Sequence, residues 1–362
     1  MSRIYEQGER VRRYIIENVE KYPSDIAKKT SDKFGITRQA ANKHLVRLTK
    51  EKALTVLGKT RAKTYKLCPI SEWSAVYQIG PGLEEHVVWS RDVSAQIGVL
   101  PENVVNILHF GFTEMFNNAI DHSGGSIISV HIKRTAADCE ILISDDGVGI
   151  FRKIQAALNL LDERHAVLEL AKGKFTTDPK NHSGQGIFFT SRMLDSFDVI
   201  SGGVFYSHQI EKENDWLSEL QEANKHGGTS VWMKIYAHTS RTSKKIFDKF
   251  SSADDDYSFN KTMFPVELAR YGDENLVSRS QAKRLLQRIE LFKVVILDFK
   301  NVPSIGQAFA DEIFRVFSSE HPDIELLPIH TNSEVKRMIE RSKGGGLWGL
   351  RAIRDLFKPN EK

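Results

Sequence analysis

The stretch NILHFGFTEMFNNAIDHSGG, residues 106–125, contains the pattern that decides the fold of the middle of the chain. Glu114 and Asn118 are four residues apart, and Asp121 or His122 continues the same side of a helix. A carboxylate one turn before a carboxamide, on a helix otherwise committed to a core, indicates a water-activating base beside a metal ligand. The apolar residues of the stretch predict a single buried face; they are Leu108, Phe112, Met115, Phe116, Ala119 and Ile120.

Three further motifs follow this predicted helix in order. CEILISDDGVGI (139–150) is typical of a strand that ends in a glycine-rich turn, and HSGQGIFFTSRMLD (182–195) places glycines where an amphipathic helix opens. GGTSVWMKI (227–235) begins another strand. Each motif alone is a weak signal, whereas the four in this order are a strong one. Their characteristic residues are Asp145, Gly147, Gly149, Gly184, Gln185, Gly186 and Thr229.

The four motifs resemble those of the GHKL ATPase superfamily, which includes histidine-kinase ATPase domains, gyrase-type ATPases and anti-sigma kinases. The resemblance implies that ATP and Mg²⁺ are the cofactors. It implies that Asn118 binds the metal and that Glu114 orients or deprotonates the attacking water. Asp145 would accept a hydrogen bond from the adenine amino group, with Thr229 supporting it.

The resemblance also assigns roles to the glycines. Gly147 and Gly149 would let the backbone pass close to the base and ribose, and Gly184, Gln185 and Gly186 would hold the phosphates through backbone N–H groups at a helix N-terminus. For His122, a structural histidine and a phosphate contact are equally compatible with the sequence.

The polar segment between the two glycine motifs, residues 152–181, would be the lid over the nucleotide. Its lysines Lys172, Lys174 and Lys180 are candidate phosphate contacts.

The chain departs from sensor kinases in two respects. Sensor kinases usually carry Asn at the position of Glu114, and Glu is typical of members that hydrolyse ATP, although anti-sigma kinases also carry Glu there. No motif resembling a phosphoacceptor helix precedes the domain, and His109, inside the predicted helix, is expected in the core. We therefore expect an ATPase rather than a histidine kinase.

The first 67 residues hold 17 Lys and Arg against 7 Asp and Glu, although the whole chain has a formal net charge of only +4. Three predicted helices, the third capped by Thr37, precede a hairpin with the basic tip GKTRAK (58–63). This layout resembles the winged-helix DNA-binding domain, which fits one helix into the major groove and a wing beside it. The residues expected to contact DNA are Arg38, Gln39, Asn42, Lys43, Arg47, Lys59, Arg61 and Lys63.

The last third alternates predicted strands and helices, which indicates a parallel α/β layer. Its pattern resembles STAS domains of anti-sigma antagonists and a related STAS-like family. Gly306, Gln307 and Ala308 stand where regulatory STAS domains carry an acid and phosphorylatable serines, and Ser304 is the hydroxyl nearby. A docking or oligomerisation module is therefore favoured over a phosphorylation switch, and a plain α/β scaffold without chemistry of its own is the preferred interpretation. The tail is expected to form an amphipathic helix.

Composition supports a soluble, cytoplasmic protein of several domains: 362 residues are 40% hydrophobic and 27% charged, with two cysteines. Neither a secretory signal nor a membrane span is expected. The fold class we predict is multidomain α+β: a winged helix-turn-helix, a GHKL α/β sandwich whose mixed sheet has helices on one face, and a STAS-like α/β domain. The predicted boundaries are 1–69 (winged helix), 70–104 (linker and beginning of the ATPase domain), 105–240 (ATPase domain), 255–345 (STAS-like domain) and 346–362 (tail).

The leading hypothesis for function is a DNA-binding transcriptional regulator that binds and hydrolyses ATP, with Mg-ATP switching its conformation or dimerisation. The expected partners are double-stranded DNA, a second copy of the chain and a protein docked on the STAS-like domain. One alternative is an anti-sigma-type protein serine kinase. Another is a partner-binding module of a stress or defence complex.

Overall fold

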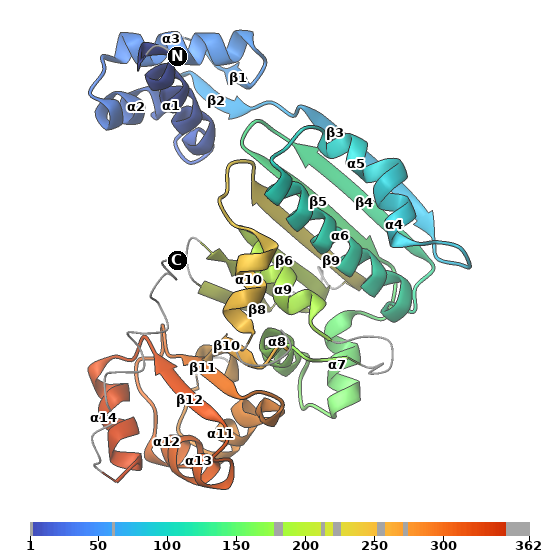
Figure 1. The fold of residues 1–362 in the computed structure, drawn as a ribbon, viewed down its shortest axis with the longest axis vertical. Coiled ribbons are helices and arrows are strands. Elements are labelled where there is room, and N and C mark those ends of the chain that lie inside the picture. Colours follow the sequence, from blue (N-terminus) through green and yellow to red (C-terminus); the bar gives the residue numbers. More distant parts are fainter. Residues whose placement is uncertain are drawn as a thin grey trace. The chain divides into compact units, whose positions relative to one another are not determined.

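The computed structural model describes residues 3–59, 62–176, 184–210, 214–219, 226–251, 258–270 and 274–344. The chain folds as two compact units (Figure 1). The first unit consists of residues 1–150 and 189–243, and the second of residues 151–188 and 244–362. The chain thus leaves the first unit directly after the GVGI motif and returns to it shortly after the second glycine motif.

The N-terminal part of the first unit contains three helices followed by an antiparallel hairpin. Thr37 caps the third helix, as expected, because its hydroxyl accepts a hydrogen bond of 3.1 Å from the Ala40 N–H. Ala41, Leu45 and Leu48 form the buried face of that helix. The elements are α1 (Arg3–Asn18), α2 (Ile26–Phe34), α3 (Arg38–Lys50), β1 (Leu54–Leu57) and β2 (Thr64–Leu67).

The rest of the first unit is built on a sheet that, within the described residues, has seven strands in the order β3-β4-β5-β9-β6-β7-β8. Each neighbouring pair is antiparallel, in place of the mixed sheet expected from the resemblance. Short turns join β4 to β5 and β6 to β7 into antiparallel hairpins. β3 and β9 pair antiparallel with these hairpins through longer connections. The strands are β3 (Ser71–Gln78), β4 (Ile127–Arg134), β5 (Asp138–Asp145), β6 (Ser196–Gly202), β7 (Val204–Gln209), β8 (Asn214–Glu219) and β9 (His226–Tyr236).

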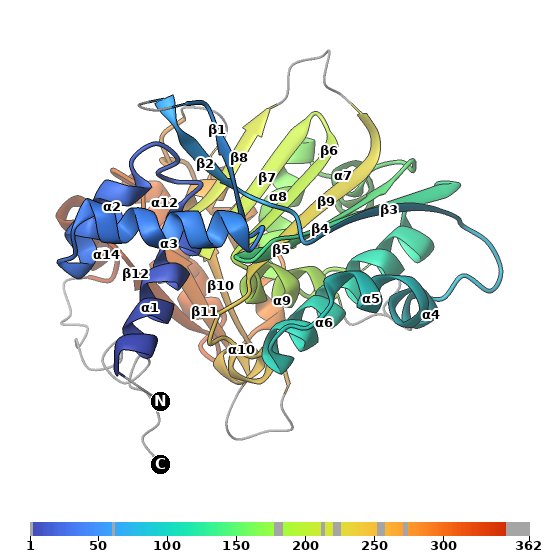
Figure 2. The same ribbon diagram turned by 90° about the horizontal axis from the view of Figure 1, so that it is seen from above.

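Helices cover one face of this sheet, as Figures 1 and 2 show for α5 and α6. The helix predicted from residues 106–125 is α6 (Glu102–His122), which packs on β4, β5 and β9 with its apolar face buried. Gly111 lets it approach closely, since an added Cβ would lie 3.2 Å from Met233 Sδ. Other helical elements are α4 (Glu85–Val88), a π-helical turn η2 (Trp89–Val93), α5 (Ser94–Ile97) and α9 (Gly186–Met193), which begins in the second unit.

The segment 70–104, expected to be partly a linker, contains an edge strand of this sheet. β3 pairs with β4 from Ser71 to Gln78, and its side chains alternate between half-buried and exposed positions. The alternation of polar and apolar residues in SEWSAVYQ is the sequence signal for this strand. The strand therefore belongs to the sheet of the first unit, at its edge.

The second unit contains, in its described part, a parallel sheet of three strands in the order β10-β11-β12, as the alternating pattern predicts. The first strand of this sheet ends at Pro265, and residues 266–269 form a 3-10 helix directly after it. The elements are α7 (Ile150–Leu158), α8 (Glu163–Lys172), α10 (Ser243–Phe250), β10 (Lys261–Pro265), η5 (Val266–Ala269), α11 (Arg279–Leu286), η6 (Ile289–Leu291), β11 (Val294–Asp298), α12 (Gln307–Asp311), η7 (Glu312–Phe317), α13 (Ser318–Glu320), β12 (Glu325–Ile329) and α14 (Ser333–Ser342).

The polar segment expected to form a nucleotide lid is part of this second unit. Its helix α8 packs against β10 and η5 and is buried along most of its length. The predicted tail helix at 346–362 lies outside the described residues. Over the described part of the chain, no helix combines the length and apolarity that crossing a membrane requires.

Candidate functional site

Asp145, at the end of β5, lies at the centre of a hydrogen-bonded turn in the first unit. Its Oδ1 accepts hydrogen bonds from the Gly147 N–H at 2.9 Å and the Thr229 N–H at 3.2 Å. The Thr229 hydroxyl in turn accepts a hydrogen bond of 2.9 Å from the Ile150 N–H. The structure thus joins the end of β5 to the beginning of β9, which bear two of the four motifs, and orients a half-buried carboxylate.

Glycines allow the chain to pass so closely around this carboxylate. Gly228 has φ +84°, and an added Cβ would lie 1.9 Å from the Asp145 carbonyl oxygen. Gly149 has φ +97°, and its Cβ would meet Ser201 Oγ at 2.7 Å. A side chain at either position would displace the turn, since L residues rarely adopt these φ values.

The C-terminal end of α6 contacts the same turn. The Ser123 carbonyl accepts a hydrogen bond of 2.9 Å from the Val148 N–H, and a Cβ on Gly147 would lie 2.2 Å from that carbonyl oxygen. Glu114, Asn118 and His122 are half-buried on α6. The first unit therefore brings together three of the four sequence motifs.

The neighbouring Asp146 fixes the turn from its solvent side. Its carboxylate accepts hydrogen bonds from the Ser126 hydroxyl at 2.6 Å, the Ser126 N–H at 2.7 Å and the Ile127 N–H at 2.9 Å. These donors, the Ser126 hydroxyl first, lower the pKa of Asp146 to about 2. The turn thus carries one carboxylate that is held for structure and another, Asp145, that is oriented beside it.

The remaining motif, HSGQGIFFTSRMLD (182–195), begins in the second unit. Gly184 has φ +68°, and an added Cβ would lie 2.5 Å from the Phe175 carbonyl oxygen, so only glycine fits. Gly184, Gln185 and Gly186 are half-buried, and Gly186 is the first residue of α9. The motif therefore forms a tight turn into a helix, as the sequence predicts.

Comparison with protein families agrees with this arrangement. Residues 83–204 match the model of the histidine kinase-like ATPase domain. The chain contains a histidine kinase-like ATPase domain. Residues 281–336 match a STAS-like domain of unknown function, and no curated protein matches the chain. The resemblances to the GHKL ATPase superfamily and to a STAS-like domain are thus confirmed, and the ATPase domain indicates nucleotide binding with a regulatory role.

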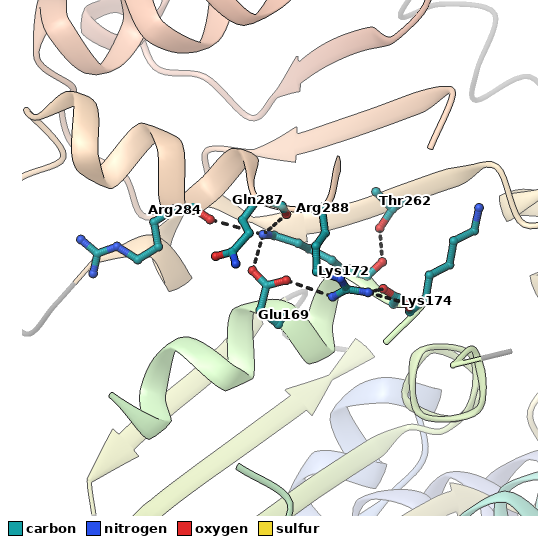
Figure 3. A network of polar contacts seen from close by, with 8 residues as sticks. Glu169, Lys172, Lys174, Thr262, Arg284, Gln287 and Arg288 are labelled. Carbon is teal, nitrogen blue, oxygen red and sulfur yellow. Dashed lines mark hydrogen bonds and ion pairs between the residues drawn. The ribbon is translucent and has the colours of Figure 1, made fainter. Parts of the chain in front are cut away.

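The lysines of the lid segment, expected as candidate phosphate contacts, bind protein groups instead where the structure describes them. Lys172 is fully buried, and its ammonium group donates to Glu169 Oε1 at 2.6 Å and to the Gln287 carbonyl at 2.7 Å (Figure 3). Burial lowers the pKa of Lys172, while Glu169 opposes this shift. Lys174 donates to the Leu291 carbonyl at 2.7 Å. Neither side chain is arranged as a phosphate contact, and Lys180 lies outside the described residues.

The structure also describes His109 and Ser304, two residues that the sequence analysis discusses. His109 is exposed rather than in the core, with its ring 4.9 Å from the ring of Trp89, because it lies beyond the buried stripe of α6. Ser304 is half-buried before α12, and Gly306 is the N-cap of that helix.

The residues expected to contact DNA lie on exposed positions where the structure describes them. Arg38, Gln39, Asn42, Lys43 and Arg47 share the solvent face of α3, and Lys59 and Lys63 flank the hairpin turn. Arg47 forms an ion pair of 2.7 Å with Glu51, so part of its charge is engaged on the same face. Arg61 lies outside the described residues.

Several residues of the ATPase-domain turn were missed by the sequence analysis. Two of them lie in doublets that could have indicated them: Gly228 is the second glycine of the pair before Thr229, and Asp146 is the second aspartate of the pair at the end of the strand. The sequence contains no signal for Ser123 or Ser201. They contribute through the Ser123 carbonyl oxygen and the Ser201 hydroxyl, which only the fold brings to the turn. Among the described residues, no group of three or more His, Cys, Asp and Glu could hold a metal ion by itself.

Proposed function

We propose that this protein binds ATP with Mg²⁺ in its ATPase domain and thereby regulates the binding of double-stranded DNA by its N-terminal segment, as a transcription regulator does. The observation that carries the proposal is the Asp145 carboxylate. Two backbone N–H groups from different motifs fix it at a strand end, in contact with a turn that also binds the end of α6. A fixed, half-buried acceptor suits the exocyclic amino group of adenine.

The other motif residues take roles in the same proposal. Asn118 offers a carboxamide oxygen to Mg²⁺, and Glu114, one turn earlier on α6, is the base for hydrolysis. The backbone N–H groups of Gly184, Gln185 and Gly186 hold the phosphates, while Gly147 and Gly149 shape the base-binding turn. His122 is a further phosphate contact of the same helix.

The donor set fits Mg²⁺ bound together with a nucleotide. Mg²⁺ commonly takes only one or two ligands from the protein and the rest from phosphates and water. A single Asn118 is consistent with that mode, as is the lack of a cluster of metal ligands among the residues described. The metal would neutralise phosphate charge, and the residues of the chain would orient the groups around it.

Binding of DNA is proposed for the N-terminal three helices and hairpin, used as a winged helix. Five long polar or basic side chains share the exposed face of α3, while its opposite face is buried. Lys59 and Lys63 extend the positive charge to the hairpin. Such a surface can neutralise several DNA phosphates, and this makes affinity strongly dependent on salt.

The nucleotide part is tested by two substitutions with different expected outcomes. Asp145→Asn should weaken ATP binding at least tenfold, because an amide places a donor where an acceptor is needed. Glu114→Ala should retain binding and lower the hydrolysis rate at least a hundredfold. Calorimetric titration and phosphate release measure the two effects, with Glu102→Gln, an exposed change in the first turn of α6, as the control. Equal loss of binding in both variants would place the site elsewhere.

Incubation with γ-labelled ATP separates hydrolysis from the kinase alternative. Label released as free phosphate supports an ATPase, whereas label retained on the chain or on an added protein supports a kinase.

Gel shifts with duplex DNA over a salt series test the DNA part. Lys43→Gln should weaken binding and reduce the salt slope by about one, whereas Lys33→Gln on the exposed side of α2 serves as the charge-matched control. Binding that is absent, or that ignores salt, would remove DNA from the proposal and favour a protein partner.

A further inference from the structure

Arg288, which lies in the matched STAS-like domain, binds residues of the lid segment between Glu169 and Lys174. Its guanidinium donates to Glu169 Oε2 at 3.0 Å, to the Gly173 carbonyl at 3.4 Å and to the Lys174 carbonyl (Figure 3). One side chain thus holds both α8 and the turn that follows it. All of these partners belong to the second unit.

The charges around Arg288 form a closed, buried set. Glu169 is 1% exposed, and its two carboxylate oxygens bind Lys172 and Arg288 separately. Lys172, in turn, donates to the Gln287 carbonyl at 2.7 Å. Because every charged group has an opposite charge and hydrogen-bond partners, the set favours a single geometry of the lid segment.

The backbone of Arg288 adds a second observation. Its φ is +63°, a left-handed conformation that is strained for a residue with a long side chain. Glycine or asparagine would adopt it more easily. The contacts of the guanidinium therefore offset a local conformational cost, as is typical of residues that hold a functional geometry.

Arg288 also reaches the second glycine motif through Phe175. The guanidinium lies 5.2 Å from the centroid of the Phe175 ring. The backbone of Phe175 is what a Cβ on Gly184 would strike, at 2.5 Å from its carbonyl oxygen. A continuous line of contacts thus runs from the STAS-like domain to the first residue of the glycine turn.

We propose that Arg288 is a positioning residue for the phosphate-binding turn Gly184–Gly186, so that the STAS-like domain sets the affinity of the protein for the triphosphate of ATP. This inference rests on the proposed function of that turn. Arg288 binds the carbonyls of Gly173 and Lys174 and lies over the Phe175 ring, and the Phe175 backbone packs closely against Gly184. The adenine side, at Asp145, is built from other residues and does not depend on Arg288.

The test compares two ligands on three variants of the full chain. Arg288→Gln should raise the dissociation constant of Mg-ATP about tenfold, within the usual range of coupling between sites, and change that of adenosine less than twofold. Arg288→Lys keeps the charge but not the forked donors, so it should fall between Arg288→Gln and the unmodified protein. Lys283→Gln, a charge loss at a position with a side chain 71% exposed on α11, should leave both constants unchanged.

Phe175→Leu keeps an apolar contact but removes the ring under the guanidinium, so it should shift Mg-ATP affinity in the same direction by a smaller factor. Thermal unfolding shows whether Arg288→Gln is folded. If it is not, the Mg-ATP affinity of Phe175→Leu tests the inference in its place.

The outcomes separate this inference from the proposed function. Unmodified protein that binds neither Mg-ATP nor adenosine overturns the proposed function and this inference with it. Binding of both ligands with unchanged Mg-ATP affinity in Arg288→Gln and Phe175→Leu overturns the inference alone. Parallel weakening of both ligands in a folded variant also overturns it, because a general structural defect would have that result.

Discussion

The turn around Asp145 and the cluster around Glu169 hold carboxylates in opposite ways. Asp145 and Asp146 accept hydrogen bonds mainly from backbone N–H groups of nearby turns and remain half-buried or exposed. Glu169 is almost fully buried and binds the cations of Lys172 and Arg288. The first arrangement keeps a carboxylate accessible to a ligand, and the second joins distant segments into one folded unit. An ionised side chain alone therefore does not identify a binding site; what surrounds it does.

The largest effect is expected from breaking the buried cluster. Lys172→Ala leaves Glu169 buried with less compensating charge and should lower the free energy of unfolding of the second unit by about 3–5 kcal/mol. Native-state hydrogen exchange of the α8 amides measures this change. Replacing both partners, as in Lys172→Met with Glu169→Gln, should cost less than the single change. Arg152→Gln, at an ion pair whose Arg152 side chain is 65% exposed, is the control and should cost under about 1 kcal/mol. A cost for Lys172→Ala as small as that of the control would contradict the contrast between the regions.

The glycine turn should respond next most strongly. Gly228→Ala places a Cβ 1.9 Å from the Asp145 carbonyl oxygen at φ +84°, so the beginning of β9 must shift. We expect a loss of about 1–3 kcal/mol in the stability of the first unit and loss of measurable ATP binding. Gly227→Ala is a matched control, because the nearest atom to its added Cβ is 3.9 Å away. Equal effects at the two positions, by thermal unfolding and nucleotide titration, would show that the close approach at Gly228 does not matter.

The smallest effect concerns acid stability. The folded pKa of Asp146, about 2, lies below its ordinary value of 3.8, so its carboxylate stabilises the folded state above pH 4. That contribution is lost as the pH falls toward 2. Asp146→Asn should therefore flatten the decline of the melting temperature between pH 4 and pH 2, whereas Asp32→Asn, an exposed change on α2, should leave the decline as it is. An unchanged slope in Asp146→Asn would mean that the hydrogen bonds from Ser126 and Ile127 are absent in solution.

The parts of the molecule that were predicted correctly are those that local pattern determines. The helix around Glu114, the cap at Thr37 and the parallel strands of the second unit follow from apolar spacing and capping chemistry. The turns at Asp145 and Gly184 follow from glycine motifs, because few residues other than glycine adopt those backbone angles.

The lid segment could not be predicted in this way. Lysine is almost never fully buried, so a lysine in a polar segment is expected at the surface. Lys172, a candidate phosphate contact of the expected lid, is instead fully buried. Its partners include the Gln287 carbonyl, 115 residues further along the chain. No local pattern links positions so far apart, and the same distance hid the membership of residues 151–188 in the second unit.

The second unit is built from two separate parts of the chain, and this affects the order in which the units can fold during synthesis. Lys172 leaves the ribosome 115 residues before Gln287. At typical rates of about 5–20 residues per second, α8 waits roughly 6–23 seconds for the segment that buries it. During that interval the first unit has time to acquire its later strands, from Ser196 to Tyr236, while the second unit lacks the sheet beginning at Lys261. The order of synthesis therefore allows the first unit to complete its sheet before the second unit closes around the lid segment.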